Sequence, residues 1–142
     1  YHFILYFDKY KVFNRIFRLI KFISQNIKFI TYIFKKYILL EDGSGFYWLQ
    51  SIENGELALA CMAPHNVCDN YTPEIDMEII NKLEIVHDDD ALLLCVVVIP
   101  KDIKKTTVNL RAPLVINTVN NKAAQVVLDN NNYAIRHLVF EQ

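Results

Sequence analysis

The chain contains 142 residues, of which 53% are hydrophobic and 22% are charged. This length suits one domain, and a chain this apolar cannot be wholly disordered. No apolar run approaches the roughly 18 residues of a membrane-spanning helix. Three cysteines are an odd number, and with no recognisable secretory leader they predict free thiols and a cytoplasmic location.

Charge divides the chain near residue 40. Residues 1–40 contain eight Lys and Arg and one acid, a charge of +7, while residues 41–142 contain seven Lys and Arg against fifteen Asp and Glu, a charge of −8. The sum of +7 and −8 is the net charge of −1. The acidic part repels phosphate, which argues against direct binding of nucleic acid and favours basic protein partners.

Residues 1–40 also differ in composition. They contain no Gly or Pro, and Phe, Ile, Lys, Tyr and Asn occupy 28 of the 40 positions. Polar side chains recur in steps of mostly three or four, at Lys11, Arg15, Arg18, Lys21, Gln25, Lys28 and Lys35. This pattern predicts a basic amphipathic helix.

Three interpretations of residues 1–34 stay open. The helix could attach to an anionic membrane surface, which would make the chain a membrane-surface adaptor. It could instead pack its broad apolar face on the rest of the chain. The third is that a frame error or a spurious extension in an A/T-rich gene produced the bias, because A/T-rich codons encode all five abundant residue types.

Short apolar runs separated by turn residues begin near Tyr37 and are typical of a mainly β domain. We predict strands at residues 37–40 and 46–52, joined by a reversal in which Gly43 and Gly45 supply backbone freedom. Asn54-Gly55 then favours a two-residue type I′ turn. Counting from that turn predicts the opposite pairs Ile52 and Leu57, Gln50 and Leu59, Trp48 and Cys61, Leu49 and Ala60, and Tyr47 and Met62. Both faces of this hairpin are largely apolar, so we expect it to lie centrally.

A short helix is predicted at about residues 73–83. Thr72 has the features of an N-cap, Pro73 of a first helical residue and Glu74 of a first-turn acid. Glu78 and Lys82 are spaced to form an i,i+4 ion pair. One side of this helix carries Ile75, Ile79, Ile80 and Leu83.

The rest of the chain continues the β pattern. A solvated loop at residues 88–90 precedes a continuous apolar run at 92–99, which is typical of a strand buried on both sides and ends at Pro100. Shorter runs follow at residues 106–110, 114–116, 123–128 and 133–140, with turns at 117–122 and 130–132. About seven strands and one helix predict a small antiparallel β-barrel-like domain or a sandwich.

Candidate metal ligands are Cys61, His65, Cys68 and Asp69. Their spacing differs from that of a C-x₂-C knuckle, Cys61 falls in a predicted strand, and no second ligand pair follows. A small zinc protein is therefore only an alternative hypothesis. The acids at residues 88–90 lack the ligand positions of an EF-hand.

Motifs for catalysis are missing from the sequence. It contains no G-x-S-x-G elbow, no phosphate-binding Gly loop and no dinucleotide fingerprint, and only three glycines in all. Arg136 and His137 have no nucleophile near them in sequence, and such a pair near a terminus favours an interface or a salt bridge. We expect no enzyme activity, no metal and no cofactor.

Six strings in order resemble the bacterial flagellar assembly factor FliW family. They are FYWLQS (46–51), DNYTPEI (69–75), VIP (98–100), TVNLRAPLVIN (107–117), QVVL (125–128) and YAIRH (133–137). The resemblance spans about residues 35–142, and the string at 107–117 is its most specific part. Residues 1–34 do not match, since the family would begin with β strands and a Gly-containing turn. Without those strands the barrel would expose unpaired edges.

The resemblance implies a function as well as a fold. Members of the family are non-enzymatic cytoplasmic proteins of flagellum biogenesis that bind flagellin before export, as a chaperone does, and also bind the translational repressor CsrA. Flagellin sequesters the factor, and after flagellin leaves the cell the freed factor antagonises CsrA and restores flagellin translation. An acidic domain suits CsrA, because an RNA-binding protein should carry basic surface. No membrane contact is expected for residues 35–142.

Nine positions within the matching strings carry polar or aromatic groups able to anchor a protein partner. They are Tyr47, Trp48, Gln50, Tyr71, Asn109, Arg111, Asn117, Arg136 and His137. We expect Trp48 and Tyr71 to belong to the core instead, while Asn109, Arg111 and Arg136 are open to either role, because charged and amide groups are seldom buried unless they are paired.

Overall fold

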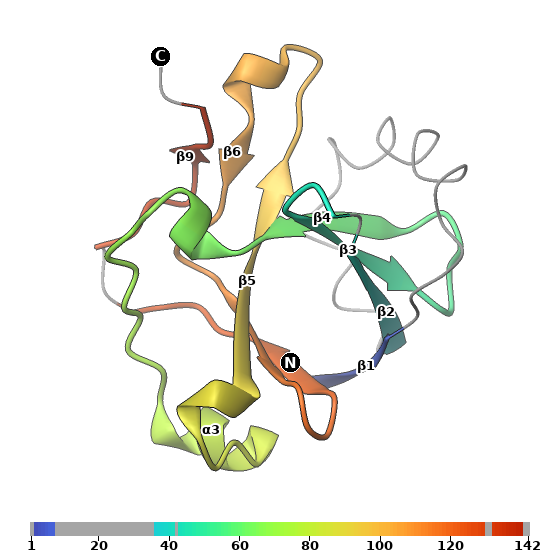
Figure 1. The fold of residues 1–142 in the computed structure, drawn as a ribbon, viewed down its shortest axis with the longest axis vertical. Helices are drawn as coiled ribbons and strands as arrows, with labels where there is room; N and C mark the ends of the chain where they lie inside the picture. Colours follow the sequence, from blue (N-terminus) through green and yellow to red (C-terminus); the bar gives the residue numbers. More distant parts are fainter. Residues whose placement is uncertain (1, 8–35, 42, 130–131, 141–142) are drawn as a thin grey trace.

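The computed structural model describes residues 2–7, 36–41, 43–129 and 132–140 (Figure 1). The strands are β1 His2–Phe7, β2 Lys36–Glu41, β3 Phe46–Ser51, β4 Ala58–Met62, β5 Ala91–Val98, β6 Thr107–Val108, β7 Leu114–Asn117, β8 Lys122–Gln125 and β9 His137–Leu138. Within these residues the helices are α3 Met77–Leu83 and three 3₁₀ turns, η1 Pro64–Asn66, η2 Asp88–Asp90 and η3 Ile103–Lys105. The prediction of a mainly β fold with one short helix is confirmed.

Hydrogen bonding between the strands closes a ring. The neighbours run β4-β3-β2-β1-β8-β7-β5, and β5 pairs in turn with β4. β6 and β9 extend the sheet from the far end of β5, where Val97 lies opposite Val108 and Thr107 opposite Leu138. β1 is parallel to β2, whereas the other described pairs are antiparallel. The arrangement is barrel-like, with this one departure from the antiparallel prediction.

β1 is a strand that the sequence analysis did not predict. It lies between β2 and β8, with Leu5 opposite Tyr37 and Phe3 opposite Ala123. The ring therefore has no open edge at β2 or β8, which removes the unpaired edges expected for a domain beginning near residue 35. The predicted basic helix at residues 11–35 lies outside the described residues.

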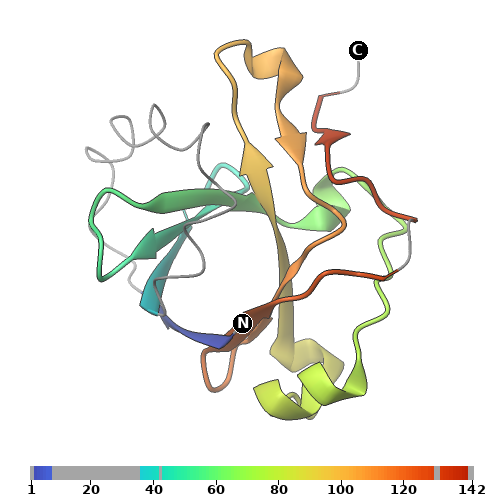
Figure 2. The ribbon, with the colours of Figure 1, turned by 180° about the vertical axis from the view of Figure 1, so that it is seen from behind.

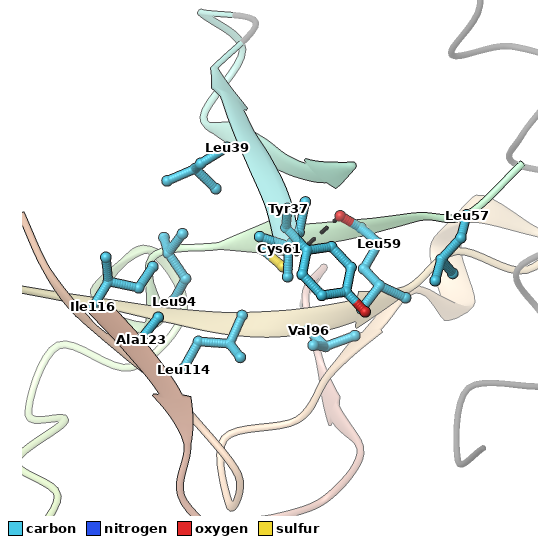
Figure 3. Close-up of a cluster of buried hydrophobic side chains, with 11 residues drawn as sticks. Tyr37, Leu39, Leu57, Leu59, Cys61, Leu94, Val96, Leu114, Ile116 and Ala123 are labelled. Carbon is cyan, nitrogen blue, oxygen red and sulfur yellow. Dashed lines mark hydrogen bonds between the residues drawn. The ribbon is translucent and has the colours of Figure 1, made fainter. Parts of the chain in front are cut away.

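The inside of the ring is filled by one cluster of buried side chains (Figure 3). Its members are Tyr37, Leu39, Leu49, Leu57, Leu59, Cys61, Leu94, Val96, Leu114, Ile116 and Ala123. They come from six strands and the turn before β4, and along each strand they occupy alternate positions, because successive side chains of a strand point to opposite faces. Burial raises the pKa of Tyr37 to about 12, with a smaller contribution from the charge of Glu53.

Two further clusters cover the outside of the ring. The first consists of Leu40, Trp48, Ala60, Met62, Tyr71, Cys95, Val97, Val108 and Leu110, and Val67, Cys68 and Val139 are among the residues that pack against it. In the other, Leu83 of α3 packs with Val115 and Ala124 on the outer face of β7 and β8. Because these clusters cover the outer face of the sheet, the strands are apolar on both faces, as predicted for the hairpin of β3 and β4 and for the apolar run of β5.

The hairpin of β3 and β4 has a different register from the one predicted. Trp48 lies opposite Ala60 and Leu49 opposite Leu59, a shift of one residue. Neither Asn54 nor Gly55 has a positive φ, so the type I′ turn is wrong. The connection instead uses side chains: the Ser51 hydroxyl accepts a hydrogen bond from the Asn54 amide at 3.1 Å, and Asn54 Oδ1 accepts one from the Glu56 amide at 3.0 Å. Such local bonds stabilise a wider turn.

The helix begins later than predicted. Its N-cap is Asp76, whose carboxylate accepts a hydrogen bond from the Glu78 amide at 2.8 Å, and not Thr72. The Thr72 amide donates to the Tyr133 hydroxyl at 3.0 Å, so this part of the chain is tied to Tyr133 and lies outside the helix. The predicted ion pair between Glu78 and Lys82 is confirmed.

The last predicted strands are mostly shorter in the structure. Residues 106–110 contribute the two residues of β6, and residues 133–140 the two residues of β9. The pairing of β7 with β8 confirms the predicted hairpin, with Asn121 in the left-handed region at φ 62°. The reversal before β3 is also confirmed, since Gly43 and Gly45 have φ of 77° and 91°.

Candidate protein-interaction surface

β9 and the residues that flank it form an exposed edge, along which exposure alternates over residues 136–140. Arg136, Leu138 and Phe140 are exposed, with Leu138 and Phe140 showing 45% and 46% of their surface, while His137 and Val139 are half-buried. The outward face therefore presents one cationic and two large apolar side chains, residue types that anchor protein interfaces.

The turn η3 lies beside this strand edge. The Val139 amide donates to the Thr106 carbonyl at 3.0 Å, and Thr106 follows directly on η3. Ile103 is 64% exposed, and Lys104 and Lys105 are exposed beside it. β6 and β9 project together at this end of the molecule (Figure 1). We define the C-terminal face as the exposed residues Ile103, Lys104, Lys105, Arg136, Leu138 and Phe140.

This C-terminal face is basic although the domain is acidic. Residues 41–142 contain seven Lys and Arg, and four of them lie at this end: Lys101, Lys104, Lys105 and Arg136. Among the described residues, the acid Asp102 approaches Lys105 at 3.8 Å. The acidic domain therefore does not present one uniform charge to its partners.

The inner side of the same segment is fixed to the core. His137 Nε2 lies 3.2 Å from the carbonyl of Val67, and Val139 packs against the outer cluster. Tyr133 packs against Tyr71 with ring centroids 4.5 Å apart and the ring planes inclined by 54°. A segment held in this way offers its outward side chains in a defined arrangement, which lowers the ordering cost of binding.

Three of the nine predicted partner residues are buried. Trp48 is 6% exposed, Tyr71 is 2% exposed and Asn117 is 2% exposed. The Tyr71 hydroxyl donates to the Leu110 carbonyl at 2.7 Å, and burial raises its pKa far above the ordinary tyrosine value. The core role expected for Trp48 and Tyr71 is confirmed.

Asn117 connects α3 to the barrel. Its Nδ2 donates to the carbonyls of Leu83 and Glu84 at 2.9 and 3.0 Å. Its Oδ1 accepts from the amides of Val119 and Asn120 at 2.8 and 3.3 Å. All the bonding capacity of this amide is used inside the protein.

Three more of the nine residues are half-buried and bonded locally. Gln50 Nε2 donates to the Leu57 carbonyl at 2.9 Å and to neighbouring carbonyls of the same turn. Asn109 Oδ1 accepts from the Arg111 amide at 3.1 Å. Burial, the charge of Glu41 and a hydrogen bond to that carboxylate raise the pKa of Tyr47.

Arg111 and Arg136 are the two guanidinium groups among the predicted residues. Arg111 is half-buried and Arg136 is exposed, and neither forms an ion pair with a described residue. Arg136 lies on the C-terminal face together with apolar residues that the sequence analysis missed. The alternation of Arg136, Leu138 and Phe140 was visible in the sequence, but which side of the strand faces outward was not.

The cysteines are not arranged around a metal. Cys61 is buried inside the ring, whereas Cys68 packs against the cluster outside it. Burial raises the pKa of Cys61 far above the ordinary thiol value and that of Cys95 to about 12. Among the described residues no group of three or more His, Cys, Asp or Glu side chains is placed to hold a metal ion. Residues 88 and 89 are exposed acids of η2.

The fold and the C-terminal face define a small barrel-like β domain with an exposed apolar and basic strand suited to contact with another protein. The sequence model of the FliW protein family matches residues 32–139. The chain belongs to the FliW family, whose members are flagellar assembly factors and not enzymes.

Relatives and a solved structure agree with this assignment. The chain is 43% identical over 108 residues to a flagellar assembly factor FliW of Caldicellulosiruptor saccharolyticus, covering 75% of this chain and 71% of the relative. It is 38% identical over 112 residues to one of Alkaliphilus metalliredigens, covering 77% and 69%. A crystal structure of the flagellar assembly factor FliW superimposes with a TM-score of 0.73 at 30% identity, over 76% of this chain and 77% of that one. Within the residues described here, no helix is long and apolar enough to span a membrane.

Proposed function

We propose that this chain acts in the cytoplasm, where it binds flagellin before export and antagonises the translational repressor CsrA, so that flagellin translation is no longer repressed. The observation that carries the proposal is the FliW family match over residues 32–139. That match includes every described element except β1, so the rest of the barrel and all of the C-terminal face except Phe140 lie within it.

The C-terminal face supports a division of the two partners. Its cations, Lys104, Lys105 and Arg136, disfavour a basic protein, because like charges brought together at an interface cost affinity. CsrA binds RNA and should therefore be basic. We assign the C-terminal face to flagellin, with Leu138 and Phe140 as its apolar anchors.

Titration calorimetry of the full chain with purified flagellin and with purified CsrA tests the proposal. Truncating both anchors, Leu138→Ala with Phe140→Ala, should weaken flagellin binding by about tenfold or more. CsrA binding should change little. Val86→Ala is the matched control, since Val86 is 77% exposed far from this strand in sequence.

A translation assay completes the test. A reporter carrying the flagellin leader and repressed by CsrA should regain translation when the chain is added, and added flagellin should restore repression. The proposal fails if the unmodified chain binds neither protein at micromolar concentration. The assignment of the face fails if the double variant binds flagellin as tightly as the control.

A further inference from the structure

A groove lies between two segments that precede α3 and follow β8. It has a volume of about 400 Å³ and is lined by Glu74, Ile75, Asp76, Val126, Val127, Leu128 and Asp129. One wall is the chain that leads into α3, and the other is the chain that follows β8. In both views the chain after β8 runs toward the chain that leads into α3 (Figures 1 and 2).

The wall after β8 carries a free strand edge. The amides of Val126 and Leu128 donate to the carbonyls of Pro113 and Arg111, both at 2.9 Å. In an extended chain the intervening residue directs its amide and carbonyl to the opposite side. The Val127 backbone has no hydrogen-bond partner among the described residues, and its side chain is 69% exposed. An added strand can pair with such an edge.

The groove is also acidic. Glu74, Asp76 and Asp129 are exposed, and no Lys or Arg is among the lining residues. None of the three forms an ion pair with a described residue. Asp76 is partly engaged as the N-cap of α3, so Glu74 and Asp129, one on each wall, are the freer carboxylates.

We infer that this groove binds an extended segment of a basic protein partner by strand addition. The backbone of the segment pairs with Val127. Because Val127 and Asp129 are two residues apart and share a face, the Lys or Arg side chains of the segment lie on that face, where their methylene stems cover Val127 and their charges reach Asp129 and Glu74. The inference rests on the proposed function, in which one of the proteins that the chain holds carries a basic surface.

A peptide probe tests the mode of binding on the full chain. The peptide acetyl-Lys-Val-Lys-Val-Lys-amide should cause saturable NMR shifts at residues 74–76 and 126–129, with a Kd below about 1 mM at low salt. Replacing its lysines by glutamates, or N-methylating its backbone amides, should abolish the shifts. No saturable shift at these residues, or equal binding by the N-methylated peptide, would overturn the inference.

A charge-matched pair of variants tests the groove against whole partners. Glu74→Gln with Asp129→Asn should weaken binding of the peptide and of CsrA by about two- to fivefold per carboxylate, and flagellin binding should hardly change. Asp88→Asn with Asp89→Asn alters net charge equally on exposed acids of η2 and should have no such effect. Equal effects of the two pairs would refute the groove. If the unmodified chain bound the peptide but neither partner, the proposed function would fail and the groove would stand.

Discussion

Replacing Asn117 by alanine should destabilise the fold without touching any partner surface. Its side chain makes four hydrogen bonds, two to carbonyls at the end of α3 and two from amides of the loop after β7. At about 1 kcal/mol net for each bond, the total is about 4 kcal/mol. Part of this is recovered, because water can reach the loop amides and Asn120 also bonds the Leu83 carbonyl. We expect a loss of about 2–3 kcal/mol.

Urea unfolding measures this loss conveniently. Trp48 is the single tryptophan and is 6% exposed, so its fluorescence reports on the outer core. The midpoint should fall at an unchanged m value. The expected decrease in Tm is about 6–10 °C for a domain of this size. Asn117→Asp should destabilise at neutral pH as well, because a carboxylate would face two carbonyls, and should recover on acidification.

Asn81→Ala is the matched control. Asn81 lies exposed on α3, and its truncation should change stability by less than about 0.5 kcal/mol. If Asn117→Ala behaved like this control and yet lost flagellin or CsrA, the side chain would be an interface residue and the structural role argued here would be refuted. Binding measured at a temperature where the variant is folded separates the two cases.

Three further predictions concern the helix start, the outer core and pH. Asp76→Ala should lower the free energy of unfolding in urea by about 1 kcal/mol, as for other N-caps, and Thr72→Ala should lower it much less. The reverse order would show that Thr72 is the N-cap, as predicted from the sequence. Tyr71→Phe should cost about 1–2 kcal/mol because it leaves a buried carbonyl without its donor, and an unchanged Tm would contradict that bond. Burial raises the pKa of Cys95 from 9.0 to about 12 and that of Tyr37 from 10.0 to about 12. The unfolded chain therefore loses these protons first, so stability should fall as pH rises from about 9 to 12, by up to about 1.4 kcal/mol per pH unit for each group. Unfolding free energies that stay level over this range would show that these groups are not buried.

The strands were predictable because their signal is local. Apolar runs bounded by Gly, Pro and Asn located β3, β4, β5 and β7 to within a few residues. Register was not predictable, because both faces of β3 and β4 are apolar and a shift by one residue leaves the hydrophobic pattern almost unchanged. What decides it is the hydrogen bonding of Ser51 and Asn54, which the sequence alone does not reveal.

Long-range contacts limited the prediction of the candidate site in the same way. Asn117 and Arg136 both lie in family strings and are both polar, yet one is buried and the other exposed. The difference arises from partners far away in sequence, the end of α3 for Asn117 and β6 for the strand that carries Arg136. Residue type and spacing could identify the polar positions but could not assign them to core or surface.

The two proposed surfaces differ in charge and in the elements that build them. The C-terminal face joins η3 to β9 and is basic, while the groove joins the chain before α3 to the chain after β8 and is acidic. Opposite charges steer different proteins to the two surfaces and reject the wrong one at each. The surfaces are nevertheless linked through one short stretch, since the Leu110 amide bonds the Ala134 carbonyl and the Arg111 carbonyl accepts from Leu128. Residues 109–113 are therefore the described segment that contacts the supporting chain of both surfaces. If flagellin and CsrA exclude each other, the variant Arg111→Ala tests whether the exclusion passes through this segment. The measurement is the binding of each partner to the variant in the presence of the other partner.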